Sequence, residues 1–220
     1  SVFMLCFLTV LAIFALFCLP LLFSAIRFYR STATDEGYLT FTLPVKTEQI
    51  IFSKLLVALI WEAATALLAI VLGVLFFMSF DVRSTLEVLQ LFPESFFRNI
   101  SEYPFWGACF AEFLVALPLC AAHGILQSYS AISIGQACGR HKLLASIGIY
   151  IGMQFAVSFL SQMLTVPVMF ASFRSTDTSL RILQDTLFLS MALNLLLIAG
   201  LLVVQFLLCR YFLKKKLNLS

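Results

Sequence analysis

The chain has few charged residues for its length. Of its 220 residues, 11% are charged and 62% are hydrophobic, whereas a soluble domain usually carries about 25% charged residues. So few charges cannot cover the surface of a water-soluble globule of this size. The composition therefore excludes an ordinary soluble domain and indicates a protein that is largely surrounded by lipid.

The chain also lacks the short motifs that usually carry chemistry. It has no P-loop lysine motif, no H-E-x-x-H, no G-x-S-x-G and no paired aspartates. Its six cysteines form no C-x-x-C pair and nearly all lie in apolar runs, which is typical of small packing residues. We therefore expect no enzymatic activity, no metal site and no bound cofactor in this chain, and no nucleic-acid partner. Any energy from ATP would have to come through another protein.

What the chain does have is a set of five long apolar runs. A helix needs about 20 predominantly apolar residues to cross the hydrocarbon core of a bilayer. The runs are too long for strands and lack the regular alternation of a barrel, so helices are the economical interpretation. We predict an all-α polytopic membrane protein with a single transmembrane domain over residues 1–220. The predicted spans are about 2–26, 50–80, 105–134, 143–173 and 187–213.

The basic residues predict the orientation of these spans. Cytoplasmic segments of membrane proteins carry an excess of Lys and Arg. Ten of the 14 basic residues share one side if the loop at residues 30–50 and the C-terminus are cytoplasmic. This orientation places Ser1, which lies directly in an apolar run, on the outer side. We therefore expect one further span upstream, so that the intact protein would have six.

The outer segment at residues 81–104 has a pattern of its own. Apolar residues at Leu86, Leu89, Phe92 and Phe96 alternate with polar ones at helical spacing. Such a pattern predicts a short amphipathic helix that lies at the membrane interface.

Polar side chains within the predicted spans are costly in lipid, so they are candidates for function. They could line a transport path, with Glu62 or Glu112 serving as an ion or proton route. They could equally hydrogen-bond one helix to another. The candidates are Glu62, Glu112, Gln127, Gln154 and Asn194.

Two glycines in the fourth span form a G-x-x-x-G pattern, Gly148 and Gly152. Small residues at this spacing let a second helix approach closely in a membrane. The pattern predicts a helix contact on this face.

The loop at residues 35–54, between the first two spans, is unusually structured for a connector. Asp35 and Glu36 can stabilise the start of a short helix over about residues 34–43, and Pro44 ends it. Thr47 can cap the next helix, and Lys54 can extend to the headgroups. We predict a short interfacial helix that is joined to the second span through a hinge, so that a push on the helix reaches the span. An inert interfacial helix would have the same pattern.

The sequence of residues 27–62 resembles the loop and following span of permease subunits in ATP-binding-cassette exporters of the type-2 permease family, especially those of Firmicutes. In that family an acidic–Gly segment, then L-x-x-T-L-P-V, a polar stretch and S-K-L form the cytoplasmic coupling helix and the start of a span. Residues 129–147 and the tail at 214–220 are similar as well. The matching positions in the loop are Asp35, Glu36, Gly37, Tyr38, Leu39, Thr42, Leu43, Pro44, Val45, Ser53, Lys54 and Leu55.

The resemblance implies a permease of the bacterial plasma membrane that forms a homodimer or a heterodimer in the lipid. Two ATP-binding-cassette subunits, which hold ATP and Mg²⁺, would press on its coupling helix. Substrates in the family range over drugs, peptides, lipids and glycans, and this chain does not select among them. The family also has a cytoplasmic helix and a span upstream that are not seen here. The implied coupling residues are Asp35, Glu36, Gly37, Tyr38, Leu39, Phe41, Leu43 and Pro44.

Two other functions remain open at this point. One is a non-catalytic immunity or sensor protein of the membrane, which would need no ATPase partner. The other is a gradient-driven transporter, which would depend on Glu62 or Glu112 and would be expected to show inverted repeats. No internal repeat is apparent in the sequence.

Overall fold

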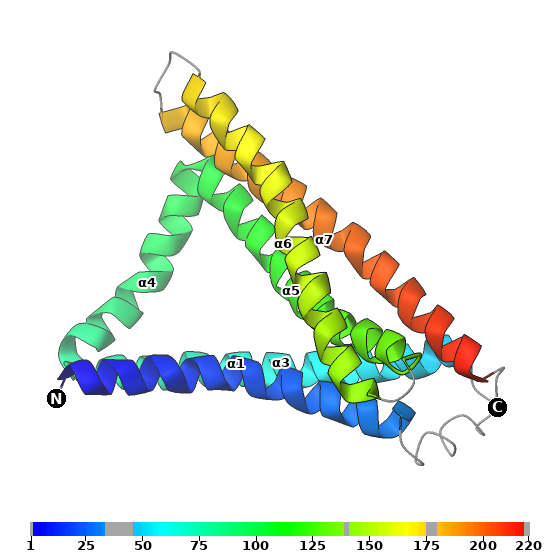
Figure 1. Cartoon of the computed structure of the whole chain (residues 1–220). Coiled ribbons are helices and arrows are strands. Elements are labelled where there is room, and N and C mark those ends of the chain that lie inside the picture. Colours follow the sequence, from blue (N-terminus) through cyan, green and yellow to red (C-terminus); the bar gives the residue numbers. More distant parts are fainter. Residues whose placement is uncertain (1, 34–45, 139–140, 175–179, 218–220) are drawn as a thin grey trace.

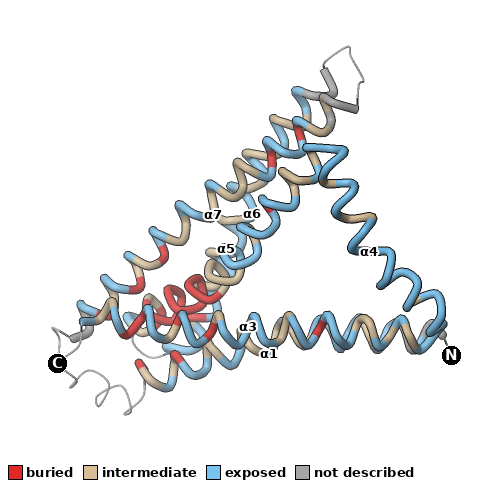
Figure 2. Tube along the Cα trace, turned by 180° about the vertical axis from the view of Figure 1, so that it is seen from behind, coloured by how far each residue is buried: buried red, intermediate tan, exposed pale blue. Residues whose placement is uncertain are grey.

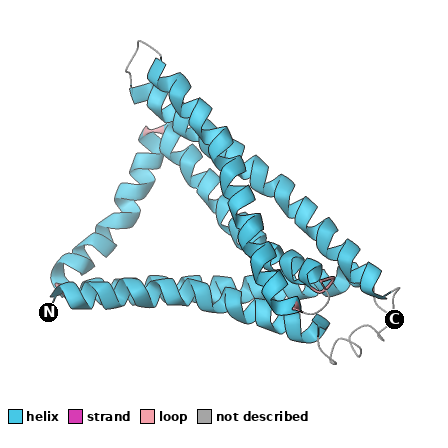
Figure 3. Cartoon of the chain, viewed as in Figure 1, coloured by secondary structure: helices cyan, strands magenta, loops and turns pink. Residues whose placement is uncertain are grey.

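The computed structural model describes residues 2–33, 46–138, 141–174 and 180–217. Within these ranges the chain is almost entirely α-helical and contains no strand (Figure 3). Five helices of the described chain are long and apolar enough to cross a membrane. The prediction of an all-α polytopic membrane protein is therefore confirmed.

The predicted spans all correspond to helices. The described helices are α1 (Val2–Ala33), α3 (Thr47–Met78), α4 (Val82–Glu102), α5 (Pro104–Gly135), α6 (Lys142–Arg174) and α7 (Leu180–Leu217). Some of them continue several residues beyond the apolar runs, because helical geometry does not stop where the side chains become polar. The stretches with the composition of a span are Phe7–Thr32, Thr47–Met78, Pro104–Gly135, Lys142–Ala171 and Gln184–Lys214.

The helices are arranged as an open triangle (Figure 1). The pair α1 and α3 forms one edge, the bundle of α5, α6 and α7 forms the second, and α4 forms the third. The first two edges meet at a vertex that also contains the C-terminal end of α7. Viewed from behind, most of the buried residues gather near this vertex (Figure 2).

The packed core at this vertex joins four helices. The ring of Phe28 on α1 stacks on the ring of Tyr129 on α5, with centroids 4.0 Å apart and planes 9° apart. Ile51 of α3 and both Cys209 and Leu213 of α7 complete the core and are almost fully buried. Away from the vertex the helices expose many large apolar side chains. Such an extensive apolar surface is what a helix needs when it faces lipid.

Helix α4 connects the far ends of the other two edges and fills nearly all of the segment in which a short amphipathic helix was predicted. The carboxylate of Asp81 caps its first turn. That carboxylate accepts hydrogen bonds from the backbone N–H groups of Arg83 (3.0 Å) and Ser84 (3.4 Å), and from the hydroxyl of Ser84 (2.5 Å). The ring of Phe96 meets that of Phe110 on α5 edge to face, with centroids 4.9 Å apart.

The cap of α4 predicts a pH effect. The hydroxyl and N–H of Ser84, together with the N–H of Arg83, hold the pKa of Asp81 below its ordinary value. Because this pKa is lowered in the folded state, the cap stabilises α4 fully above the ordinary value of about 4 and is lost as the pH falls through the lowered one. We expect hydrogen exchange in the first turn of α4, corrected for intrinsic rates, to accelerate below about pH 4. Asp81→Asn keeps an acceptor that does not titrate, and its exchange should lack this acceleration; an equal acceleration in both proteins would contradict the assignment.

Candidate functional site

The sequence places its strongest functional candidate in the loop before α3, and α3 begins directly beyond it. The implied coupling residues lie outside the described residues: Asp35, Glu36, Gly37, Tyr38, Leu39, Phe41, Leu43 and Pro44. The structure does describe the first turns of α3 and what they contact. These contacts form a helix junction, by which we mean the core around Phe28, Ile51, Tyr129 and Leu213 and its polar neighbours.

The start of α3 differs in one detail from the prediction. Thr47 was expected to cap the helix, but it is the first helical residue, and Lys46 occupies the cap position. The backbone N–H of Lys46 donates a hydrogen bond of 3.2 Å to Oε1 of Gln49. The prediction was wrong because a glutamine three residues into the helix can satisfy the preceding N–H without a capping hydroxyl.

The first two turns of α3 are held to two other helices. The Glu48 carboxylate forms an ion pair of 2.8 Å with the guanidinium of Arg210 near the end of α7. One turn later Ile51 is completely buried in the core. The hydroxyl of Tyr129 on α5 then donates to the carbonyl oxygen of Lys54 at 3.4 Å. A displacement of the start of α3 would therefore also displace α5 and α7.

Polar contacts connect the remaining helices of the junction. The amide of Gln136, just beyond α5, donates to Oγ1 of Thr32 on α1 at 3.1 Å. One turn earlier on α5, the hydroxyl of Ser133 lies 3.3 Å from Sγ of Cys209 on α7. Buried polar groups that find partners in this way make a core specific as well as stable.

Three of the polar candidates in the spans form hydrogen bonds between helices. Nε2 of Gln127 on α5 donates to Oε1 of Gln154 on α6 at 2.9 Å. The amide of Asn194 on α7 donates to Oγ1 of Thr165 on α6 at 2.9 Å and accepts from the hydroxyl of Ser161. These residues therefore link α6 to each of its two neighbours in the bundle.

The two acidic candidates lie on different helices, Glu62 on α3 and Glu112 on α5. Glu112 is buried, and neither of its carboxylate oxygens has a hydrogen-bond partner among the described residues. Glu62 is partly buried, and its Oε1 is likewise without a described partner. The ion pairs of the described chain involve neither residue. A buried carboxyl group without a partner is costly in lipid, so each of the two remains a candidate for function.

Two further polar groups were not selected from the sequence. His123 of α5 lies against Gln205 of α7, which is only 1% exposed. The two side chains are close enough to interact, but no hydrogen bond of ordinary geometry is formed by Nδ1 of the histidine or by the polar atoms of the amide within the described part of the chain. In the sequence each is one isolated polar residue in an apolar run, and only the packing of α5 on α7 brings them together.

The predicted helix contact at Gly148 and Gly152 stays a prediction. A Cβ atom added to either glycine would have no described atom of its own chain within 4 Å. A helix that packs there would therefore lie outside the described residues of this chain. The close approach within this chain is at Gly135 instead, where an added Cβ would lie 2.7 Å from the Cα and backbone nitrogen of Ser146.

No protein-family model, curated protein or solved structure matches this chain. Its function has to be inferred from its own residues and from the resemblance of its first loop. The described residues contain no group of side chains that could hold a metal ion. The helix junction is a packed connection that directly follows the predicted coupling segment. Such an arrangement can transmit movement from one helix to another.

Proposed function

We propose that this chain is the membrane-spanning permease subunit of an ATP-binding-cassette exporter in a bacterial plasma membrane. The observation that carries the proposal is the likeness of residues 27–62 to the coupling loop and following span of type-2 permeases. A separate ATP-binding subunit would supply the energy, and the permease would act as a homodimer or heterodimer. In this proposal the loop at residues 30–50 and the C-terminus are cytoplasmic.

The contacts of the helix junction support a coupling role for this loop. Glu48 is joined to Arg210 at 2.8 Å, and Ile51 lies in the core three residues further on. The segment that an ATPase would press is therefore followed at once by residues anchored to α5 and α7. Because close-packed interiors shift as units, a push at this position would move several helices together.

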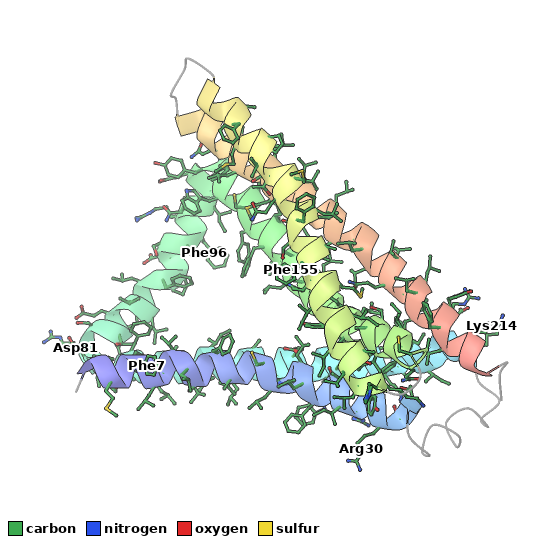
Figure 4. All side chains as sticks on the ribbon, viewed as in Figure 1. Phe7, Arg30, Asp81, Phe96, Phe155 and Lys214 are labelled. Atoms are coloured by element: carbon green, nitrogen blue, oxygen red, sulfur yellow. The ribbon has the colours of Figure 1, made fainter. Side chains whose placement is uncertain are left out.

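The positions of the basic residues support the proposed orientation. Arg30 at the end of α1 and Lys214 at the end of α7 lie at the same side of the molecule, where two edges of the triangle meet (Figure 4). Asp81, which follows α3, lies at a distant corner. An excess of Lys and Arg on one side is typical of the cytoplasmic face.

The proposal is tested by the double substitution Glu36→Ala/Leu39→Ala in the complex with its ATP-binding subunit. We expect expression and assembly to be unchanged and ATP hydrolysis stimulated by the permease to fall several-fold. The substitutions remove one acidic and one apolar side chain of the predicted coupling helix, which are the groups that would contact the ATP-binding subunit. The measurement is ATP hydrolysis by the purified complex in lipid. A matched control is Glu87→Ala/Leu91→Ala, which removes the same two side-chain types from exposed positions on α4.

Two results would contradict the proposal. One is unchanged hydrolysis in the Glu36→Ala/Leu39→Ala complex, and the other is the absence of any ATP-binding-cassette subunit that purifies with the chain.

The unpaired carboxyl group of Glu112 favours a second candidate, a gradient-driven transporter. A gradient-driven transporter would carry its substrate without an ATPase, and the variant Glu112→Gln would lose this transport.

A further inference from the structure

A cavity of about 770 Å³ lies between α1 and α3, beside Tyr129 of α5. This volume is in the range of about 300–1,000 Å³ that is usual for small-molecule sites. Its walls combine two kinds of side chain. Arg27 and Lys54 contribute positive charge, whereas Leu19, Phe23 and Trp61 contribute apolar surface. A ligand that fits both walls has an anionic head and an apolar tail.

The two cations are held close together without a counter-charge in the described chain. The amino group of Lys54 donates to the hydroxyl of Ser31 and lies 5.6 Å from the centre of the Phe28 ring. Arg27 is near enough for the two like charges to repel each other. The ion pairs of the described residues are Arg83 with Glu87 and Arg210 with Glu48, so neither pocket cation belongs to one. An anion between Arg27 and Lys54 would relieve the repulsion.

The apolar wall is open to the surroundings of the protein. The side chains of Leu19, Phe23 and Trp61 line the cavity and remain largely exposed. In a membrane such surface faces lipid rather than water, so an amphiphile can enter sideways from the bilayer. Trp61 lies seven residues beyond Lys54 on α3, about 10 Å further along the helix toward the middle of the span, where an acyl chain would lie. A free inorganic anion would leave this wall unused.

We propose that this cavity binds an anionic phospholipid of the surrounding bilayer, with its phosphate between Arg27 and Lys54 and an acyl chain along Leu19, Phe23 and Trp61. Basic pockets between membrane helices attract anionic headgroups, and each cation near the surface contributes to the attraction. The inference does not depend on the proposed exporter function. It rests on the cavity and its charges alone.

The two tryptophans of the chain make a direct test practical. In Trp106→Phe, the only tryptophan left is Trp61 in the cavity wall. Brominated lipids quench a tryptophan that they touch. The full chain is placed in phosphatidylcholine vesicles that contain brominated phosphatidylglycerol or, in parallel, the same fraction of brominated phosphatidylcholine. We expect the apparent affinity for the anionic lipid to exceed that for phosphatidylcholine on the order of tenfold.

Four variants show whether this preference belongs to the cavity. Arg27→Gln/Lys54→Gln, and to a lesser degree the exposed Arg27→Gln alone, should remove it. Arg30→Gln removes a charge from the same end of α1 without changing the cavity lining, so its preference should persist. Trp61→Phe moves the reporter to Trp106, which does not line the cavity and should be quenched equally by both lipids.

Several outcomes would overturn the proposal. Equal quenching of Trp61 by both lipids would show that no anionic lipid is selected. A preference that survives Arg27→Gln/Lys54→Gln, or that falls equally in Arg27→Gln and Arg30→Gln, would show general attraction to a basic surface. A preference abolished by added inorganic phosphate would show a site for a free anion. In contrast, loss in Arg27→Gln with retention in Arg30→Gln would support the lipid site.

Discussion

Replacing Gly135 with valine is expected to destabilise the protein strongly. A Cβ atom at this position would lie 2.7 Å from two backbone atoms of Ser146, closer than real contacts allow. Backbone atoms cannot rotate away as a long side chain can, so α5 and α6 would have to separate. Overpacking of this kind costs about 1–3 kcal/mol and occasionally more, and we expect the upper part of this range. The measurement is the thermal midpoint in detergent micelles, together with the yield of monodisperse protein.

Gly73→Val is the matched control for this prediction. Gly73 lies within α3, and an added Cβ there would have no described atom within 4 Å. The same change of side chain should therefore leave the midpoint nearly unaltered or raise it slightly, since glycine is a poor helix former. If Gly135→Val unfolded at the same temperature as Gly73→Val, the close approach of α5 to α6 would be wrong.

Replacing Tyr129 with alanine is expected to disrupt the helix junction. The side chain is 2% exposed, and its ring stacks on Phe28 at 4.0 Å. Its removal would leave a void between α1, α3 and α5, because the rigid helices cannot collapse into the space. Aromatic-to-alanine substitutions in cores cost about 3–5 kcal/mol. We expect a fall of that size in the free energy of unfolding, measured by thermal or denaturant unfolding in micelles.

The variant Tyr129→Phe distinguishes the contribution of the ring to stability from that of the hydroxyl. It keeps the stack on Phe28 and removes the polar contacts of the hydroxyl, which are with the side chain of Ser24 and, at a long 3.4 Å, with the carbonyl oxygen of Lys54. A net hydrogen bond contributes about 0.5–1.5 kcal/mol, and a long one falls at the lower end. The phenylalanine variant should therefore lose far less stability than the alanine variant. Equal losses would show that the hydroxyl, not the stacked ring, holds the junction together.

The helices of this protein could be predicted because each depends on a local property. A run of about 20 apolar residues has to satisfy its own backbone in lipid, and a helix does so within one segment. The amphipathic pattern at Leu86, Leu89 and Phe92 likewise indicated α4, although the helix proved longer than expected. The cap of α3 was assigned wrongly, since Thr47 and Lys46 with Gln49 offer competing solutions within one turn.

Most partners in the candidate site could not be predicted. Gln127 and Gln154 are visible in the sequence as costly residues, but their hydrogen bond depends on which faces of α5 and α6 meet. The same holds for the contact of Gly135 with Ser146, whereas a Cβ atom added to the more conspicuous Gly148 or Gly152 would meet no other described helix within 4 Å. In a soluble protein an apolar stripe would show which face is inside. In lipid both faces are apolar, so this signal is lost.

The sequence by itself determined that the chain is an all-α membrane protein, where its apolar helices lie, and which loop resembles a coupling segment. These properties follow from composition and from backbone hydrogen bonding within one segment at a time. The tertiary structure alone decided that Phe28, Ile51, Tyr129 and Leu213 meet in one core, and that Arg27 and Lys54 share a cavity with Trp61. Such contacts join residues on different helices, and helix packing in lipid depends on side-chain shape and polar partners that hydrophobic periodicity does not encode.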